Sequence, residues 1–132
     1  MINIVLDTNI IISAALSPKG NPAKILELVT NDEEVQIYYN APIIAEYQDV
    51  LSREHLKLSI KTQHRIINTI KKAGILIDPT TSKIPLPDES DRIFYDTAKA
   101  VNAYLITGNL KHYPEESYII PPAKFIEIFV NQ

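Results

Sequence analysis

The sequence contains no cysteine. This absence excludes disulfides, thiolate metal sites and cysteine nucleophiles, and it is consistent with a reducing, intracellular environment. A long apolar run is also missing: the stretch from Ile10 to Leu16 is interrupted by Ser13 and is far shorter than the about 18 residues that a membrane span needs. Because the chain opens without a basic and apolar leader, we expect a cytoplasmic protein with no membrane segment.

Positive charge and aromatic side chains are both scarce. The 13 lysines and arginines are outnumbered by 16 aspartates and glutamates, which gives a net charge of −3 and a pI of about 5.6. A protein that binds nucleic acid through charge alone is expected to be basic, so any such binding here needs a local patch or metal ions. The aromatic residues, 8% of the chain, fall at spacings typical of a core and offer no stacking platform for single-stranded nucleic acid.

The overall composition is that of an ordinary soluble protein. Apolar residues make up 45% and charged residues 22% of the 132 residues. This length and composition predict a single domain over residues 1–132 with a core of its own.

Apolar segments of two kinds alternate along the chain. Short β-branched runs predict strands over residues 2–6, 35–39, 75–77, 103–106 and 118–120. Apolar residues three and four apart predict helices over residues 8–16, 22–29 with Asn21 as cap, 41–52, 56–73, 91–102 and from Pro121-Pro122 onward. In the helix over 56–73 the residues expected to face the core are Ile60, Ile66, Ile67 and Ile70. The alternation predicts an α/β fold, a three-layer α/β/α sandwich with a mostly parallel central sheet.

Polar residues follow directly on two of the predicted strands. Asp7 and Asn9 come after the strand over 2–6, and Thr107 and Asn109 come after the strand over 103–106. In parallel α/β sheets, ligands bind beyond the carboxyl ends of the strands, so these side chains are candidates for a site. Taken alone, Asp7 is equally well explained as a helix cap, and residues 107–109 are better explained as a plain turn.

Further acids lie on two predicted helices. Glu46 lies about 40° from Val50 around its helix, on the flank of the apolar stripe, which favours a cleft over bulk water. A lone glutamate at such an edge is more commonly just an exposed side chain. Asp88 and Asp91 lie at the start of the helix over 91–102, where acids also suit the positive end of the helix dipole.

Together these residues predict a site for a divalent cation. Two strand ends, a helix flank and a helix start can converge at one crevice and bring together Asp7, Glu46, Asp91 and Asn109. Clustered carboxylates repel one another unless a cation holds them. Oxygen ligands without cysteine or paired histidines favour Mg²⁺ or Mn²⁺ over zinc, and magnesium in such sites usually serves phosphate chemistry.

Four segments in this order resemble the PIN-domain family, and in particular the PIN-domain toxins of bacterial and archaeal toxin–antitoxin pairs. They are Val5-Leu6-Asp7-Thr8-Asn9, Ala45-Glu46 within the helix from Pro42 to Leu51, the block from Asp88 to Ala98, and Leu105-Ile106-Thr107-Gly108-Asn109-Leu110-Lys111-His112-Tyr113. The resemblance runs essentially end to end. It implies an α/β/α sandwich and a Mg²⁺- or Mn²⁺-dependent ribonuclease that forms homodimers and is blocked by a cognate antitoxin.

The resemblance also implies roles for individual residues. The catalytic and metal-holding acids would be Asp7, Glu46 and Asp91, with supporting roles for Asn9, Thr107, Asn109 and Asp88. Many relatives carry a carboxylate where this chain has Asn109, so a second metal ion would bind weakly. The candidates for holding RNA phosphates are Arg53, Lys57, Arg92 and Lys111, although each is otherwise an ordinary surface charge. His112, interpreted as a surface loop residue, is left outside the catalytic set.

The leading hypothesis is metal-assisted hydrolysis of RNA phosphodiesters by the toxin of a toxin–antitoxin pair. A phosphotransferase with Asp7 as nucleophile is disfavoured, because Asn9 stands where such enzymes commonly place a second aspartate. A catalytically weak or inactive PIN-like module that binds a protein partner or RNA remains the alternative, since Asn109 removes one expected acid.

Overall fold

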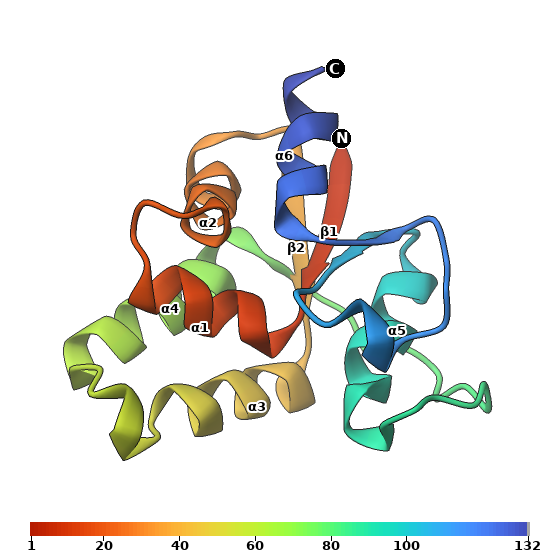
Figure 1. The fold of residues 1–132 in the computed structure, drawn as a ribbon, viewed down its shortest axis with the longest axis horizontal. Coiled ribbons are helices and arrows are strands. Elements are labelled where there is room, and N and C mark those ends of the chain that lie inside the picture. Colours follow the sequence, from red (N-terminus) through yellow and green to blue (C-terminus); the bar gives the residue numbers. More distant parts are fainter. Residues whose placement is uncertain (132) are drawn as a thin grey trace.

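A computed structural model describes residues 1–131 and shows a central sheet of five parallel strands (Figure 1). The strands are β1 (Ile2–Leu6), β2 (Val35–Tyr39), β3 (Ile75–Leu76), β4 (Tyr104–Ile106) and β5 (Ile119–Ile120). Their order is β3-β2-β1-β4-β5. The chain starts at the centre of the sheet, builds outward through β2 and β3, and then adds β4 and β5 on the other side of β1. The predicted α/β fold with a parallel sheet is confirmed.

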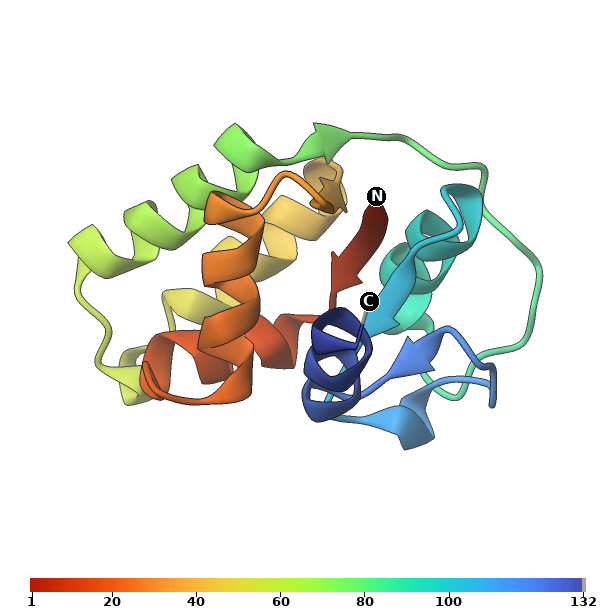
Figure 2. The same cartoon turned by 90° about the horizontal axis from the view of Figure 1, so that it is seen from above.

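Helices cover both faces of this sheet. They are α1 (Thr8–Leu16), α2 (Asn21–Asn31), α3 (Ala41–Leu51), α4 (Ile60–Ala73), α5 (Arg92–Ala100) and α6 (Pro122–Val130), with 3₁₀ turns η1 (Glu54–Leu56), η2 (Glu89–Asp91) and η3 (Leu110–His112). Helices α2 and α4 pack on β2, whereas α5 packs across β1, β2 and β4. Seen from above, α1, α2 and α4 lie on one side of β1 and α5 lies on the other (Figure 2). Of the helices within residues 1–131, none is long and apolar enough to cross a membrane.

Strand β1 lies at the centre of the core. Ile4, Val5 and Leu6 are completely buried, because β2 and β4 flank the strand and helices cover both faces of the sheet. A strand buried in this way is a continuous apolar run rather than an alternating pattern. The run therefore ends where the strand reaches the edge of the sheet, which is at Asp7.

Helix α4 begins at Ile60, later than the predicted start at residue 56. Ser59 caps the helix by accepting a hydrogen bond from the Thr62 N–H at 3.1 Å. Leu56 lies instead in η1, which is followed by Lys57 with a left-handed φ of 54°. Ile60, as the first helical residue, is 69% exposed and does not join the core. The later isoleucines of this helix are buried as predicted: Ile66, Ile67 and Ile70.

Two other helix ends differ from the prediction. Gly20 rather than Asn21 is the N-cap of α2, and Asn21 is its first helical residue. The helix predicted over 91–102 is shorter, because residues up to Asp91 belong to η2 and α5 ends at Ala100. Asn102 then turns the chain toward β4 with a positive φ of 52°, a conformation that asparagine tolerates better than most residues.

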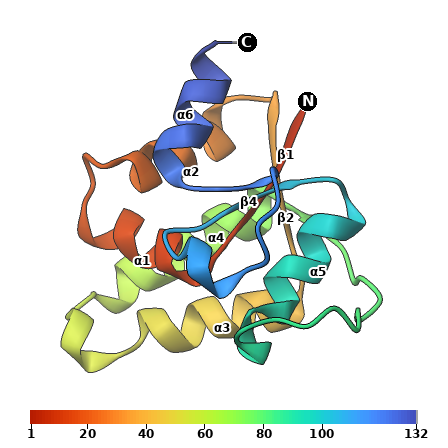
Figure 3. The ribbon, with the colours of Figure 1, turned by 45° about the vertical axis from the view of Figure 1, so that its right-hand side comes forward.

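The segment between β3 and η2 has no regular secondary structure over residues 77–88. It runs around the outside of α5 before it enters η2 (Figure 3). We call it the β3–α5 loop, and its end delivers Asp88 to the start of η2.

Candidate functional site

The carboxyl ends of β1 and β4 lie side by side and place two polar residues together. Leu6 pairs with Ile106 at the last position of the two strands, and the Asp7 N–H donates to the Ile106 carbonyl at 3.0 Å. Asp7 and Thr107 therefore leave the sheet next to each other. The chain continues from β1 to β2 on one side, whereas β4 lies on the other, so this is the point where ligands bind in open α/β sheets.

The Asp7 carboxylate is buried and held by three donors. Its Oδ1 accepts a hydrogen bond from the Thr8 N–H at 2.8 Å, which makes Asp7 the N-cap of α1. Its Oδ2 accepts from the Thr107 hydroxyl at 2.7 Å and from Asn9 Nδ2 at 3.2 Å. Asp7 thus caps helix α1 and also belongs to a polar cluster with Asn9 and Thr107.

A second layer of hydrogen bonds fixes the residues that hold Asp7. The Gly108 N–H donates to Asn9 Oδ1 at 2.9 Å, and the Asn109 N–H donates to Thr107 Oγ1 at 2.9 Å. A Cβ atom added to Gly108 would lie 3.3 Å from Asn9 Oδ1, so the absence of a side chain helps this close approach. The turn after β4 therefore orients the Asp7 carboxylate.

Asp91 is a buried carboxylate directed at the same place from the junction of η2 and α5. Its burial and the charge of Asp7 raise the pKa of Asp91 from 3.8 to about 6. Nδ1 of His112 lies 3.3 Å from Asp91 Oδ2, but this oxygen accepts no well-aligned hydrogen bond from the described residues. The charge of Asp7 thus acts on Asp91 across the site.

Asp88 adds negative charge near this pair. It is exposed, and its Oδ1 accepts hydrogen bonds from the Ser90 N–H at 2.9 Å and the Ser90 hydroxyl at 2.8 Å. These hydrogen bonds lower the pKa of Asp88, so it stays ionised at neutral pH. Its charge in turn contributes to the raised pKa of Asp91.

Three residues at the site were not predicted to belong to it: the buried tyrosines Tyr47 and Tyr113, and His112. The Tyr47 hydroxyl donates to the Leu6 carbonyl, and burial together with the charge of Asp7 raises the pKa of Tyr47 well above its usual range. Burial and the charges of Asp7 and Asp91 likewise raise the pKa of Tyr113. Helical spacing made Tyr47 look like an ordinary core residue. The position of Tyr113 at the end of the last motif was the one available signal.

Glu46 lies half-buried on α3, as its place on the flank of the apolar stripe predicts. Within residues 1–131, however, no group of three or more histidine, aspartate and glutamate side chains is placed to hold a metal ion. Asp7, Glu46 and Asp91 thus do not form a three-carboxylate metal cluster among the described residues, and the electrostatic coupling joins Asp7 to Asp91. A Mg²⁺ ion needs no more than one or two carboxylates and keeps several of its waters. Two hard oxygen donors, one of them buried without a well-aligned hydrogen bond, fit such an ion.

The four candidate phosphate contacts lie in different environments, and Lys57 is an exposed side chain directly after η1. Arg53 pairs with Asp49 at the surface, with N···O at 3.4 Å, and Lys111 is exposed on η3 next to His112. The guanidinium of Arg92 is instead occupied by hydrogen bonds to Glu89 and to the β3–α5 loop, and its side chain is only 13% exposed. Arg92 would have to give up these partners to bind a phosphate.

Known proteins share the fold and part of the sequence. An uncharacterized protein of Methanocaldococcus jannaschii is 31% identical over 111 residues, which cover 82% of this chain and 71% of that protein. The solved structure of PAE2754 from Pyrobaculum aerophilum is similar with a TM-score of 0.64 and 12% identity, over 99% of this chain and 91% of that one. VapBC2 from Rickettsia felis, solved bound to a DNA fragment from its promoter, is similar with a TM-score of 0.56 and 21% identity, over 83% and 90% of the two chains.

The family model of the PIN domain matches residues 3–111. The match runs from β1 to η3 and includes both Asp7 and Asp91. PIN domains are in general nucleases that use divalent metal ions. With this match over most of its length, the chain belongs to the PIN domain family.

Proposed function

We propose that this PIN domain is a Mg²⁺- or Mn²⁺-dependent endoribonuclease of the cytoplasm and the toxin of a toxin–antitoxin pair. The observation that supports this proposal best is a pair of buried carboxylates, Asp7 at the end of β1 and Asp91 at the start of α5. Asp7 and Asp91 are both buried, and the charge of Asp7 helps to raise the pKa of Asp91. A fold that holds two carboxylates together against their repulsion gains from a cation bound between them.

In this proposal Asp7 and Asp91 hold the metal ion, and Glu46 acts as a general base that orients the attacking water. When bound, the ion supplies a Lewis acid that neutralises the charge of the phosphate and makes water a better nucleophile at neutral pH. Thr107 and Asn9 keep the Asp7 carboxylate in one orientation, as outer-shell partners of metal ligands do.

The remaining supporting residues set the charge of the site. Asp88 adds a negative charge beside Asp91, and Asn109 contributes an uncharged amide oxygen where many relatives have an acid. Tyr47 and Tyr113 lie on the core side as uncharged phenols, because their raised pKa values keep them protonated. One tightly bound ion is therefore favoured over two.

Lys111 is the proposed contact for an RNA phosphate next to the scissile bond. It lies exposed on η3, the turn that also carries His112 to within 3.3 Å of Asp91. A hollow of about 450 Å³ borders this turn and is lined by Gly108, Asn109, Leu110, Lys111, His112 and Pro121. Arg53 is proposed as a second, more distant contact. The exposed cations proposed as phosphate contacts are few, so the affinity of the protein for RNA should rest largely on the metal ion.

A cognate antitoxin and a second copy of the chain are the proposed protein partners. The structural likeness to VapBC2 from Rickettsia felis supports the antitoxin. Light scattering of the purified chain tests the homodimer: twice the mass of 14.9 kDa is expected, and a monomer at all concentrations would contradict it.

Cleavage of a mixed pool of cellular RNA by the purified chain tests the activity. The reactions contain Mn²⁺, Mg²⁺ or EDTA and compare the natural chain with Asp91→Asn and with Asp32→Asn as matched control. Asp32 precedes β2, at the opposite end of the sheet from the site, and asparagine can keep its hydrogen bond with the Glu34 N–H. We expect both ions to support cleavage by the natural chain and by the control.

Two outcomes would contradict the nuclease. One is cleavage that persists in EDTA, and the other is full activity of Asp91→Asn. A folded chain that neither cleaves RNA nor gains stability from Mn²⁺ would favour the alternative, a PIN-like module that binds a protein or RNA. Stability is a sensitive readout here, since a ligand at 100 times its Kd adds about 2.7 kcal/mol.

A further inference from the structure

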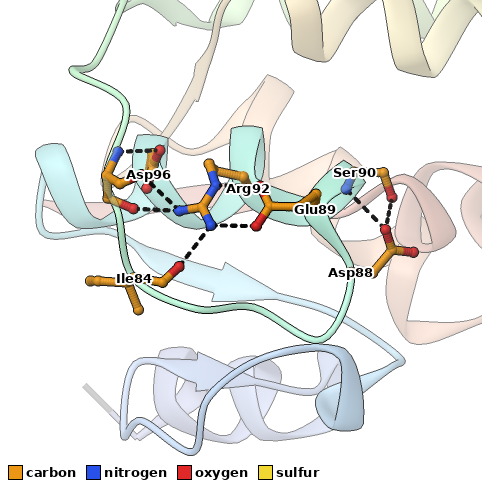
Figure 4. Close-up of polar contacts among 7 residues, drawn as sticks. Ile84, Asp88, Glu89, Ser90, Arg92 and Asp96 are labelled. Atoms are coloured by element: carbon orange, nitrogen blue, oxygen red, sulfur yellow. Dashed lines mark hydrogen bonds and ion pairs between the residues drawn. The ribbon is translucent and has the colours of Figure 1, made fainter.

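Arg92, in the first turn of α5, uses its whole guanidinium group within the protein. Nε and Nη2 donate to the two carboxylate oxygens of Glu89 at 2.8 and 2.6 Å. Nη1 donates to the carbonyl and the hydroxyl of Ser82 at 2.9 and 2.8 Å, and Nη2 also donates to the Ile84 carbonyl at 2.7 Å (Figure 4). The Arg92 side chain is 13% exposed and its three hydrogen bonds to the loop are partly buried, whereas Glu89 is 71% exposed.

Asp96, one turn further along α5, holds the same loop from a second point. Its Oδ2 accepts a hydrogen bond from the Ser82 N–H at 2.9 Å (Figure 4). Both main-chain groups of Ser82 are therefore bound by α5 side chains. The β3–α5 loop has no regular secondary structure, and Pro79, Pro85 and Pro87 in it have no N–H to donate. Arg92 and Asp96 thus supply hydrogen bonds that the loop does not make by itself.

The groups that Arg92 binds lie before the turn that carries the acids and within that turn. Ser82 and Ile84 precede Asp88, and Glu89 lies between Asp88 and Asp91. The Asp91 N–H donates to the Asp88 carbonyl at 3.2 Å, which completes the turn. The guanidinium therefore ties the loop, the turn and α5 together within a few residues of Asp91.

The burial of Asp91 gives this tie a function. Its carboxylate is buried and its Oδ2 accepts no well-aligned hydrogen bond from the described residues, although moving the turn outward would hydrate it. An arrangement of this kind persists only when the surrounding structure over-determines it. Arg92 is suited to that task, because its planar fork can bind two acceptors on Glu89 and three on the loop in one fixed geometry.

We propose that Arg92 is a positioning residue that clamps the β3–α5 loop to α5 and thereby holds Asp91 at the site beside Asp7. The clamp rests on the proposed function only in what Asp91 does there, namely hold a divalent ion. It differs from the sequence-based hypothesis that Arg92 binds an RNA phosphate, because a clamped guanidinium acts on the acids and not on the substrate.

Lysine at position 92 separates these two roles. Arg92→Lys keeps a positive charge for a phosphate but cannot span five acceptors with a single ammonium group. Arg92→Gln removes the charge as well. The matched control is Arg65→Lys together with Arg65→Gln, since Arg65 is an exposed arginine on α4.

Three measurements on the full chain test the clamp. Hydrogen exchange of residues 78–91, in the absence of metal, reports whether the loop and turn stay closed. Titration calorimetry with Mn²⁺ reports the affinity of the carboxylate pair, and RNA cleavage separates kcat from KM. For both Arg92 variants we expect faster exchange confined to 78–91, Mn²⁺ affinity lower by about tenfold or more, and a fall in kcat with little change in KM. Both Arg65 variants should match the natural chain.

Several results would overturn the clamp. Unchanged exchange in 78–91 would show that the loop does not depend on Arg92. Faster exchange with unchanged Mn²⁺ affinity would reduce Arg92 to a stabilising residue without a positioning role. A raised KM in Arg92→Gln alone, with Arg92→Lys normal, would support phosphate binding instead. Failure of the natural chain to bind Mn²⁺ would contradict the proposed function, and unchanged exchange would still reject the clamp independently.

Discussion

Replacing Asp91 by asparagine should stabilise the folded protein at alkaline pH while it removes the proposed activity. Burial and the charge of Asp7 raise the pKa of Asp91 from 3.8 to about 6. At about 1.4 kcal/mol per pKa unit, ionised Asp91 costs the folded state about 3 kcal/mol if the site excludes water. His112 at the rim is 48% exposed, so water reaches the site and screens the charges. We therefore expect Asp91→Asn to gain about 1–2 kcal/mol at pH 8.

The stability gained by Asp91→Asn should depend on pH. The folded-state pKa of Asp91 lies above the unfolded value, so the folded protein binds this proton more tightly. The free energy of unfolding of the natural chain should therefore fall as the pH rises from about 4 through 6. Below a pH of about 4 the carboxyl group is protonated in both states, and asparagine should bring no gain. Above a pH of about 7 the gain should be complete.

Urea unfolding at pH 8 and pH 4 in the presence of EDTA measures both limits, with Asp32→Asn as the control that should change little. Saturating Mn²⁺ at pH 8 should then stabilise the natural chain by about 2.7 kcal/mol at 100 times its Kd, and it should leave Asp91→Asn unchanged. The order of the two proteins would thus reverse. A destabilised Asp91→Asn at pH 8, or an equal gain at both pH values, would refute the idea that Asp91 is held against repulsion.

Three further substitutions have expected outcomes. Asp7→Asn should lose about 1–2 kcal/mol of unfolding free energy in urea, because the NH₂ group of asparagine would replace a carboxylate oxygen that now accepts hydrogen bonds, among them the one from Asn9 at 3.2 Å. A gain in stability like that of Asp91→Asn would contradict the assigned hydrogen bonds. Thr107→Val should cost about 1–3 kcal/mol by removing the donor 2.7 Å from Asp7, whereas Thr107→Ser, which keeps the hydroxyl, should cost less; equal losses would point to packing instead. Gly74→Ala should lower the unfolding free energy by about 1–3 kcal/mol, because its Cβ would lie 2.7 Å from the Tyr39 ring, and an unchanged thermal midpoint would disprove this contact.

The sheet and its first acid could be predicted because local sequence carries their signal. Strand β1 is buried on both faces, so its residues form an uninterrupted apolar run, and Asp7 is conspicuous as the polar residue that ends it. Thr107 and Asn109 stand out after β4 for the same reason. The predicted start of α4 was wrong because Leu56 continues the apolar spacing. Spacing alone does not show that the helix begins after the Ser59 cap.

The surroundings of Asp91 were beyond the reach of sequence patterns. The pKa of its carboxyl group is raised by burial and by the charge of Asp7, which lies 84 residues away in the sequence. Arg92 looked like a free surface cation, because nothing in its local sequence shows that the β3–α5 loop folds back over it. Tyr47 has a spacing typical of a core residue, and only the fold shows that the charge of Asp7 acts on it.

Because of the strand order, the residues of the site are synthesised at different times. Asp7 leaves the ribosome with the first strand, but the hydroxyl of Thr107 that orients it lies 100 residues later. At about 5–20 residues per second, the first half of the site waits roughly 5–20 s for the second. A nascent or truncated chain that ends before β4 therefore carries Asp7 without Thr107, and its site is incomplete. The proposed nuclease can therefore be assembled only after β4 has paired with β1.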